Sequence, residues 1–383
     1  MKNKHFVHIT AVTQVCPDGQ KCIRAVIEMD CEIEPSSVSK DTFHVQGRHV
    51  TSVEAVGKKI ILELDSQDEN AMTYHPGNPW MHIPSTVSEA SVEIVQKSDI
   101  YSCEGEVIPA CKEIDFSDQC ENELVDEFIQ GEFEGLKYNL FIPRDYDSRK
   151  KYPLVQFIHD AGPTGSDPRL TLTQGIGAVV WTTEEEQKKH SCFVFAPQFD
   201  GAPIVDDNWN VDSRLEIAKS ALDQIVADYS IDTTRIYTTG QSMGCMSSIV
   251  LNIRYPEFFA ASLLIAGQWD EQGIEGLEKQ HLWMINSQGD AKAFPIMNQM
   301  NVVMEHRGAK IVHHVWRADL SQQEYKEIAD TLIATGANII YTPYLIETVA
   351  DGWHSNGGEH HVNTWRTAYG IEAVREWLFS NHR

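Results

Sequence analysis

Residues 240–244 read GQSMG and match the pattern G-x-S-x-G, in which a serine stands between two glycines. The residues before them, 235–239, predict a strand, and the residues after them, 245–254, predict a helix. A serine on the tight turn between a strand and a helix is exposed as a nucleophile, and small flanking residues let the chain segments approach closely. This context favours Ser242 as a nucleophile over an incidental serine in a glycine-flanked turn.

A serine hydroxyl is a weak nucleophile at neutral pH and needs a histidine base that an acid orients. In a strand–turn–helix arrangement of this kind the acid follows the serine in the chain and precedes the histidine. Asp290 lies in a short loop after the apolar stretch 281–286, which predicts a strand. Asp290 is therefore predicted as the acid, and the alternative is a solvated loop aspartate.

Three histidines, His354, His360 and His361, precede the last predicted helix, which we expect to begin at Asn363 or Thr364 because either residue can cap it. A base held just before this helix would be His361. His360 and His354 remain alternatives.

The oxyanion formed during acyl transfer needs two backbone N–H donors. One should be the amide of Met243, directly after the nucleophile. The other should come from residues 159–162, HDAG, which follow the predicted strand 153–158 and take the place of an H-G-x-G motif. The amide of Asp160 or of Ala161 is predicted as this donor, and Asp160 stands where that motif has glycine.

Aromatic residues near these motifs are candidates for the substrate pocket. Trp269 follows a predicted strand at the edge of the sheet where ligands bind in such folds, and Trp181 follows the glycine-containing segment 174–177. Trp181, Trp269 and Gln241 are predicted to line the pocket. Ordinary core packing is the alternative for both tryptophans, and Trp209 is a third candidate.

The elements that position these residues divide the chain into two parts. Before residue 99 the sequence predicts short strands without amphipathic helices, which is typical of a small immunoglobulin-like β-sandwich, and a polar connector near 99–125 follows. From about residue 135 apolar strands alternate with helices such as 213–228, which predicts an α/β domain with a mostly parallel sheet covered on both faces. The predicted domains are 1–125 and 126–383. The predicted strands are 5–12, 22–29, 42–46, 58–64, 91–96, 136–142, 153–158, 193–196, 235–239, 261–266, 282–286, 310–316 and 338–343.

The whole pattern resembles the PHB-depolymerase-like carboxylesterases, an α/β-hydrolase family whose members carry an N-terminal immunoglobulin-like domain. The residues that carry the resemblance are 152–162, 174–181, 231–244, 266–270, 364–369 and 376–379. The resemblance implies a triad of Ser242, Asp290 and a histidine shortly before Thr364, where His361 matches but the extra His360 leaves the register open by one residue. It also implies hydrolysis of short-chain carboxylic esters, and an N-terminal domain that packs on or near the active site and supports a homo-oligomer.

The composition of the chain indicates which classes of binding partner and which compartment to expect. With 31 Lys and Arg against 56 Asp and Glu, the formal net charge of −25 disfavours nucleic acid and anionic membranes and favours a neutral substrate. A small ester, the substrate that the predicted triad would hydrolyse, meets this condition. No apolar stretch approaches the roughly 20 residues of a membrane span, and no leader pattern opens the chain, so we expect a cytoplasmic protein; a secreted protein without its signal peptide is the alternative. The eight cysteines form no CxxC pair, which favours free thiols over disulfides.

Other functions share these motifs. A serine peptidase or amidase would use the same triad, and a non-catalytic surface or carbohydrate-binding protein could keep a relic hydrolase domain. The intact serine, acid and histidines argue against the relic. A metal site built from His354, Glu359 and His361 matches no established ligand spacing, so neither a metal nor a cofactor is predicted.

Overall fold

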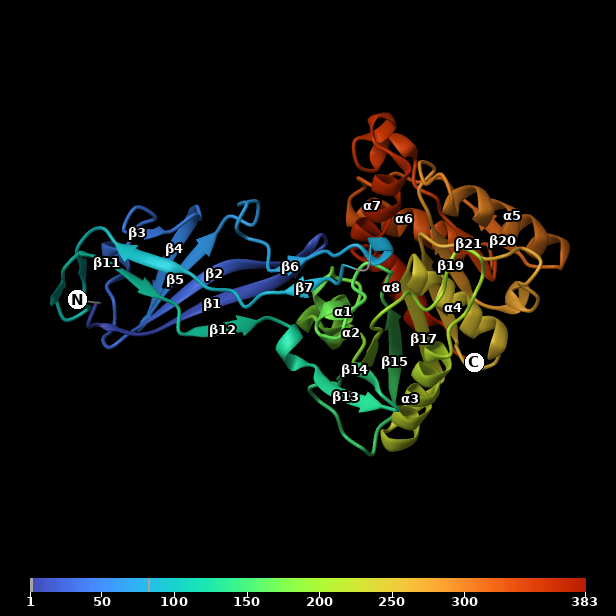
Figure 1. The fold of residues 1–383 in the computed structure, drawn as a ribbon, viewed down its shortest axis with the longest axis horizontal. Helices are drawn as coiled ribbons and strands as arrows, with labels where there is room; N and C mark the ends of the chain where they lie inside the picture. Colours follow the sequence, from blue (N-terminus) through green and yellow to red (C-terminus); the bar gives the residue numbers. More distant parts are fainter. Residues whose placement is uncertain (1–2, 82) are drawn as a thin grey trace. The chain divides into compact units, whose positions relative to one another are not determined.

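The computed structural model describes residues 3–81 and 83–383, and the chain groups into two compact units (Figure 1). The first unit contains the chain up to His75 together with Val87–Glu127, and the second contains Pro76–Thr86 together with Phe128–Arg383. The sequence predicted a single boundary near residue 125 and did not anticipate that the segment Pro76–Thr86 groups with the second unit.

The first unit is a β-sandwich. Its larger sheet has the strand order β12-β1-β2-β5-β4 and its smaller sheet the order β11-β8-β3. Alternating apolar side chains such as Ala25, Ile27, Ile60 and Leu62 are fully buried in its core. The strands are β1 (Phe6–Cys16), β2 (Gly19–Met29), β3 (Phe43–Val45), β4 (Val50–Val56), β5 (Lys59–Leu64), β6 (Tyr74–His75), β7 (Thr86–Val87), β8 (Glu93–Gln96), β9 (Ile100–Tyr101), β10 (Val107–Ile108), β11 (Cys111–Phe116) and β12 (Gln119–Asn122).

The predicted connector near 99–125 is wrong as a description of this region, because it contains strands β9 to β12. β11 pairs antiparallel with β8, and β12 pairs parallel with β1. Both strands are rich in charged and polar residues, and most of their side chains are at least partly exposed. Strands at the edge of a sandwich bury few side chains and can form with few apolar residues. The search for apolar, β-branched runs therefore did not identify them.

The second unit is built on a nine-stranded sheet with the order β13-β14-β16-β15-β17-β18-β19-β21-β20. β13 and β14 are antiparallel additions at one edge, and the other strands run parallel. This is the mostly parallel sheet that the alternating strands and helices predicted. Its strands are β13 (Ile129–Phe133), β14 (Leu136–Phe141), β15 (Tyr152–Ile158), β16 (Phe193–Gln198), β17 (Ile231–Gln241), β18 (Ala261–Ile265), β19 (Leu282–Ile285), β20 (Ile311–His313) and β21 (Ile339–Tyr341).

Helices cover both faces of this sheet. On one face α3, α4 and α5 pack against strand side chains such as Leu154, Phe193 and Leu264 in one large apolar cluster. On the other face Trp283 of β19 contacts Trp377 of α8, and Phe157 of β15 contacts Tyr369. The helices are α1 (Leu170–Thr173), α2 (Glu184–Lys189), α3 (Arg214–Asp228), α4 (Met243–Arg254), α5 (Ala293–His306), α6 (Gln322–Ile333), α7 (Gly357–Ala368) and α8 (Glu372–Ser380).

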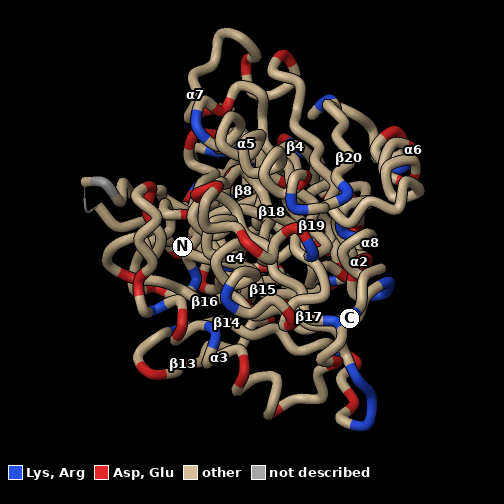
Figure 2. Tube along the Cα trace, turned by 90° about the vertical axis from the view of Figure 1, so that its right-hand side faces the viewer, with Lys and Arg blue, Asp and Glu red and all other residues tan. Residues whose placement is uncertain are grey.

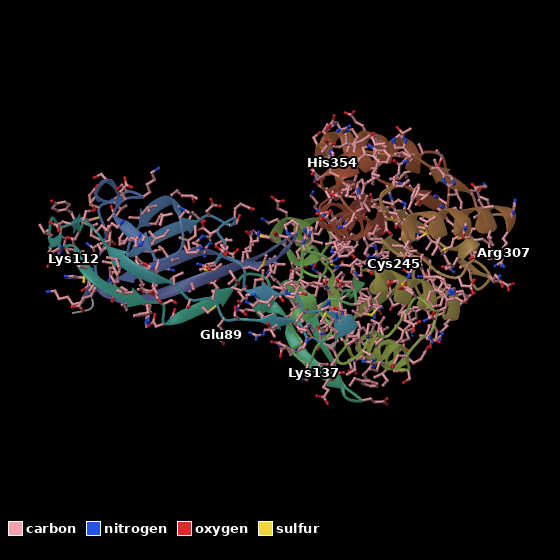
Figure 3. The ribbon with its side chains drawn as sticks, turned by 45° about the horizontal axis from the view of Figure 1, so that its top comes forward. Glu89, Lys112, Lys137, Cys245, Arg307 and His354 are labelled. Atoms are coloured by element: carbon pink, nitrogen blue, oxygen red, sulfur yellow. The ribbon has the colours of Figure 1, made fainter. Side chains whose placement is uncertain are left out.

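The charged side chains are mixed in sign along both units, and the cysteines form no disulfide within the described residues. Asp and Glu are scattered over many elements, with Lys and Arg interspersed among them (Figure 2). All eight cysteines are free thiols, including the buried Cys245 of α4 (Figure 3). No helix within residues 3–81 and 83–383 has the length and apolar character needed to cross a bilayer.

Candidate active site

Ser242 lies on the turn between β17 and α4, where its backbone has the unusual φ of 52° and ψ of −118°. The turn is tight because it passes next to the end of β15. A Cβ atom added at Gly244 would lie 1.9 Å from the carbonyl oxygen of Ile158, and one added at Gly240 would lie 2.6 Å from the same oxygen. Both glycines are therefore required by the close approach of the chain, and the strained turn presents the serine at the carboxyl end of the sheet.

Two side chains line up behind the serine hydroxyl. His361 Nε2 lies 2.8 Å from Ser242 Oγ, and His361 Nδ1 lies 2.5 Å from Asp290 Oδ2. The three residues come from the turn after β17, the loop after β19 and helix α7, so the sheet and one helix bring together groups that are far apart in sequence. The arrangement can pass a proton from the hydroxyl to the imidazole while the carboxylate orients the ring.

Asp290 is held as a carboxylate. Its side chain is 3% exposed, and its Oδ1 accepts hydrogen bonds from the amides of Lys292 (3.0 Å) and Ala293 (2.9 Å). Burial by itself raises the pKa of Asp290. The hydrogen bond and charge of His361, together with the two amides, lower the pKa by more than burial raises it, so it lies below the usual value.

Helix α7 begins earlier than predicted. α7 starts at Gly357, not at Asn363 or Thr364, because Asn356 and Glu359 form a capping box in which each side chain accepts a hydrogen bond from the backbone of the other residue. His360 and His361 therefore lie within the helix rather than in a loop before it.

The other two histidines do not contact Ser242. His360 is 1% exposed, and its ring bonds to Ser287 Oγ (3.1 Å) and to the carbonyl of Gly352 (2.9 Å). His354 lies on the surface of the second unit (Figure 3). No three His, Cys, Asp or Glu side chains in the described part of the chain are arranged to hold a metal ion.

The turn after β15 lies beside the nucleophile. Its residues Asp160, Ala161 and Gly162 line the same pocket as Ser242 and Met243. The amide of Gly162 donates to Asp160 Oδ1 (2.7 Å), whereas those of Asp160 and Ala161 have no hydrogen-bond acceptor within residues 3–81 and 83–383. Two free amides thus lie next to the start of α4, as an oxyanion site requires.

The pocket above Ser242 has a volume of about 480 Å³. Met246, Val205, Val362 and Trp365 contribute apolar wall, and Asp207 and Lys292 form an ion pair at its rim. Its lining residues are Pro79, Asp160, Ala161, Gly162, Pro203, Val205, Asp206, Asp207, Ser242, Met243, Met246, Gln268, Asp290, Ala291, Lys292, Gly357, Gly358, His361, Val362 and Trp365.

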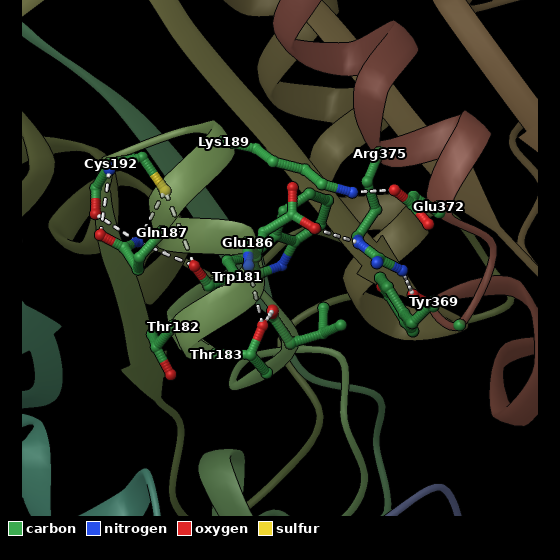
Figure 4. Close-up of polar contacts among 12 residues, drawn as sticks. Trp181, Thr182, Thr183, Glu186, Gln187, Lys189, Cys192, Tyr369, Glu372 and Arg375 are labelled. Carbon is green, nitrogen blue, oxygen red and sulfur yellow. Dashed lines mark hydrogen bonds and ion pairs between the residues drawn. The ribbon is translucent and has the colours of Figure 1, made fainter.

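The three residues predicted to line the pocket do not line it. Trp181 is fully buried, its Nε1 donates to the carbonyl of Gly177, and its own carbonyl accepts from Gln187 of α2 (Figure 4). Trp269 packs against Trp209 at 5.4 Å as part of the apolar core.

Gln241 is 1% exposed and donates to Asp160 and Gln174 instead of reaching the pocket. All three predictions failed for one reason: the carboxyl end of the sheet also holds core, and loops from distant parts of the chain decide which side chains reach the cavity.

Trp365 is an aromatic residue of the pocket that the sequence analysis missed in this role. Its ring meets that of His361 edge to face at 5.2 Å, because the two residues are four positions apart on α7. The helical spacing from His361 to Trp365 could have indicated this neighbour if the start of α7 had been placed correctly.

Comparisons with known proteins agree with this architecture. Residues 8–109 match the family described as the esterase Ig-like N-terminal domain. The structure is similar to that of a thermostable esterase at 26% identity, with a TM-score of 0.82, covering 98% of this chain and 100% of the other. No curated protein matches the sequence.

Two more distant structures share less. A feruloyl esterase module from Clostridium thermocellum in complex with sinapinate has 12% identity and a TM-score of 0.41, covering 64% of this chain and 88% of its own. A puromycin-hydrolyzing peptidase from Mycobacterium tuberculosis has 13% identity and a TM-score of 0.44, covering 96% of this chain and 54% of its own.

The fold and the full-length similarity define a hydrolase of the α/β class that is preceded by an immunoglobulin-like domain. The N-terminal part matches the esterase Ig-like N-terminal domain over residues 8–109. The resemblance to esterases with such an N-terminal domain, which the sequence predicted, is thereby confirmed.

Proposed function

We propose that this protein is a serine carboxylesterase that hydrolyses short-chain esters through an acyl-enzyme. The observation that carries the proposal is the pair of distances around His361, 2.8 Å to Ser242 Oγ and 2.5 Å to Asp290 Oδ2, at the base of an open pocket. A full-length structural neighbour described as a thermostable esterase supports the same chemistry.

In the proposed reaction Ser242 Oγ attacks the ester carbonyl carbon and its proton passes to His361 Nε2. Asp290 holds the Nδ1–H tautomer and stabilises the imidazolium. The amide of Met243, with that of Asp160 or Ala161, stabilises the oxyanion. His361 then protonates the departing alcohol, which leaves the acyl group on Ser242. Water attacks this acyl ester and gives its proton to His361, which returns it to Ser242 Oγ as the carboxylic acid is released.

The preference for short acyl groups rests on what closes the pocket. Met243 and Met246 line it, yet they are 2% and 4% exposed and belong to the apolar core. A long acyl chain would have to displace packed core side chains at this side, which is costly.

Hydrolysis of p-nitrophenyl acetate, butyrate and octanoate by the wild type and by Ser242→Ala tests the proposal. We expect kcat/KM to fall with chain length, and Ser242→Ala to lose about 10⁴-fold or more in kcat. Activity on a matched p-nitroanilide but on none of the esters would reject the esterase in favour of the peptidase alternative.

A further inference from the structure

The carboxylate of Asp160 is engaged on both oxygens. Oδ1 accepts the amide of Gly162 at 2.7 Å, and Oδ2 accepts Nε2 of Gln241 at 3.0 Å. The same nitrogen of Gln241 lies 3.2 Å from Gln174 Oε1. Asp160 and Gln241 are therefore joined in one network, and neither side chain takes part in the reaction proposed above.

This network links the two sides of the oxyanion site. Gln241 directly precedes Ser242, so it is fixed to the turn whose next amide is that of Met243. Asp160 belongs to the turn 159–162, which holds the free amides of Asp160 and Ala161. The bond from Gln241 to Asp160 therefore sets the spacing between the two sets of amide donors.

The rest of the turn is restrained in the same way. The ring of His159 bonds to the carbonyl of Asp160 (2.6 Å) and accepts the amide of Phe199 at Nε2 (3.0 Å). The hydroxyl of Thr164 donates to the carbonyl of Ala161 at 2.7 Å. With these carbonyls and the Gly162 amide occupied, the amides of Asp160 and Ala161 are the groups left to face a ligand.

Gly162 fits closely against this carboxylate. A Cβ atom at Gly162 would lie 2.8 Å from Asp160 Oδ1. The aspartate side chain can therefore fold back onto the backbone of residue 162 because that residue is a glycine. Asp160 supplies an acceptor that the glycine of an H-G-x-G motif could not supply. A negative charge close to a developing oxyanion is unfavourable by itself, so a benefit from Asp160 has to come from geometry.

We propose that Asp160 and Gln241 are positioning residues that fix the oxyanion-binding turn 159–162 relative to the nucleophile turn. This inference rests on the proposed function, because it assigns the residues to the same reaction. It replaces the prediction from the sequence that Gln241 lines the substrate pocket.

The test compares Gln241→Leu, Asp160→Ala and Asp160→Asn with the wild type on p-nitrophenyl butyrate, with the folded fraction measured by circular dichroism. We expect kcat to fall about 10-fold in Gln241→Leu and about 10²-fold in Asp160→Ala, with KM nearly unchanged. The larger loss is at the lower end of the range for losing one oxyanion donor, about 10²–10³-fold. Asp160→Asn keeps an acceptor for the Gly162 amide and should recover part of the loss.

A second readout separates positioning from general stability. An alkyl boronic acid adds to the serine and places an oxygen at the oxyanion site, so its Ki should rise by the same factor by which kcat/KM falls. Gln280→Leu is the matched control, because Gln280 is also a buried glutamine, and its Nε2 donates to the carbonyl of Pro256 at 2.7 Å. This control should lower the melting temperature without changing kcat or the Ki.

Several results would overturn the inference. One is kcat per folded molecule unchanged in both Gln241→Leu and Asp160→Ala. Another is a raised KM at constant kcat, which would return Gln241 to substrate binding. A faster Asp160→Ala would mean that charge repulsion outweighs positioning. Failure of the proposed function looks different, because then the wild type itself would hydrolyse no ester or Ser242→Ala would remain active.

Discussion

Asp290 couples the proposed chemistry to the stability of the fold. Its pKa lies below the usual value when folded, while the unfolded carboxyl titrates near about 4. The carboxylate therefore stabilises the fold above that pH, and this contribution is lost as the pH falls through the folded value. We expect Asp290→Asn to lower kcat about 10⁴-fold at about pH 7. The unfolding free energy of Asp290→Asn should lie furthest below that of the wild type at that pH, and the difference should shrink below about pH 4. Urea unfolding of both proteins across this pH range checks the point, and a deficit independent of pH would contradict it.

His360 and His361 are neighbours with different environments. His361 reaches Ser242, whereas His360 is buried between Ser287 Oγ and the carbonyl of Gly352. We expect His361→Ala to lose about 10⁴-fold in kcat. His360→Ala should lose about 2 kcal/mol of unfolding free energy and far less activity per folded molecule, because it leaves a cavity and unpaired polar groups. Ester kinetics and urea unfolding separate the two, and equal losses of activity in both variants would argue against this division of roles.

The sequence patterns located the residues of the proposed triad better than they located the residues that line the pocket. Ser242 and Asp290 follow apolar strands, and strand ends can be located from the sequence because apolar runs are local signals. Whether Trp181 or Trp365 reaches the cavity depends on packing between segments almost two hundred residues apart, which a local pattern does not contain. Trp181, for example, is fully buried and its ring meets that of Phe379 edge to face at 5.9 Å.

At the scale of elements, α7 carries His361 and begins with a capping box. α6 has the same device, formed by Ser321 and Glu324, away from the pocket. We expect Asn356→Ala and Ser321→Ala each to lose about 1 kcal/mol of stability. Asn356→Ala alone should also lower kcat/KM several-fold, because the first turn of α7 lines the pocket and leads to the proposed base. Thermal unfolding and ester kinetics on both variants provide the check, and unchanged kinetics in Asn356→Ala would count against it.

The nucleophile turn depends on glycine at an identifiable contact. A methyl group at Gly244 would meet the carbonyl of Ile158 at 1.9 Å, whereas one at Gly273 would meet nothing closer than 3.5 Å. We expect Gly244→Ala to abolish activity and to cost at least about 3 kcal/mol of stability, as overpacking of a tight core does. Gly273→Ala should leave both unchanged within error. Activity assays and thermal melts of the purified variants decide this, and an active Gly244→Ala would refute the contact.

Element boundaries show why part of the fold escaped prediction. Strands β15, β16, β18 and β19 of the central sheet are apolar and buried on both faces, so their positions were predicted to within a few residues. The edge strand β13 is mostly exposed and was not predicted. The start of α7 was misplaced because Gly357 and Gly358 favour a loop, while the capping box that overrides them is a pairwise hydrogen-bond pattern of Asn356 and Glu359. The polar strands β11 and β12 were missed because their pairing comes from tertiary contacts.

At the scale of the whole molecule, the segment Pro76–Thr86 belongs to the catalytic unit although the chain on either side of it belongs to the first unit. Ser85 Oγ donates to the carbonyl of Gly162 at 2.8 Å, next to the proposed oxyanion turn, and Pro79 lines the pocket. Cutting the chain at residue 128 would remove a piece of the catalytic unit and not only a neighbouring domain.

A fragment of residues 128–383 retains the large apolar core of the second unit, so we expect it to fold, with a lower melting temperature than the full chain. Its kcat/KM should be at least about 10-fold lower, because the turn 159–162 loses a restraint and the pocket loses part of its wall. Ser85→Ala in the full chain should reproduce a part of this loss, with about 1 kcal/mol of stability. Ser88→Ala is its control, since Ser88 bonds to Thr73 within the first unit. A fragment as active as the full chain would mean that the catalytic unit needs no residue before 128, and the contacts of Ser85 and Pro79 would then carry no functional weight.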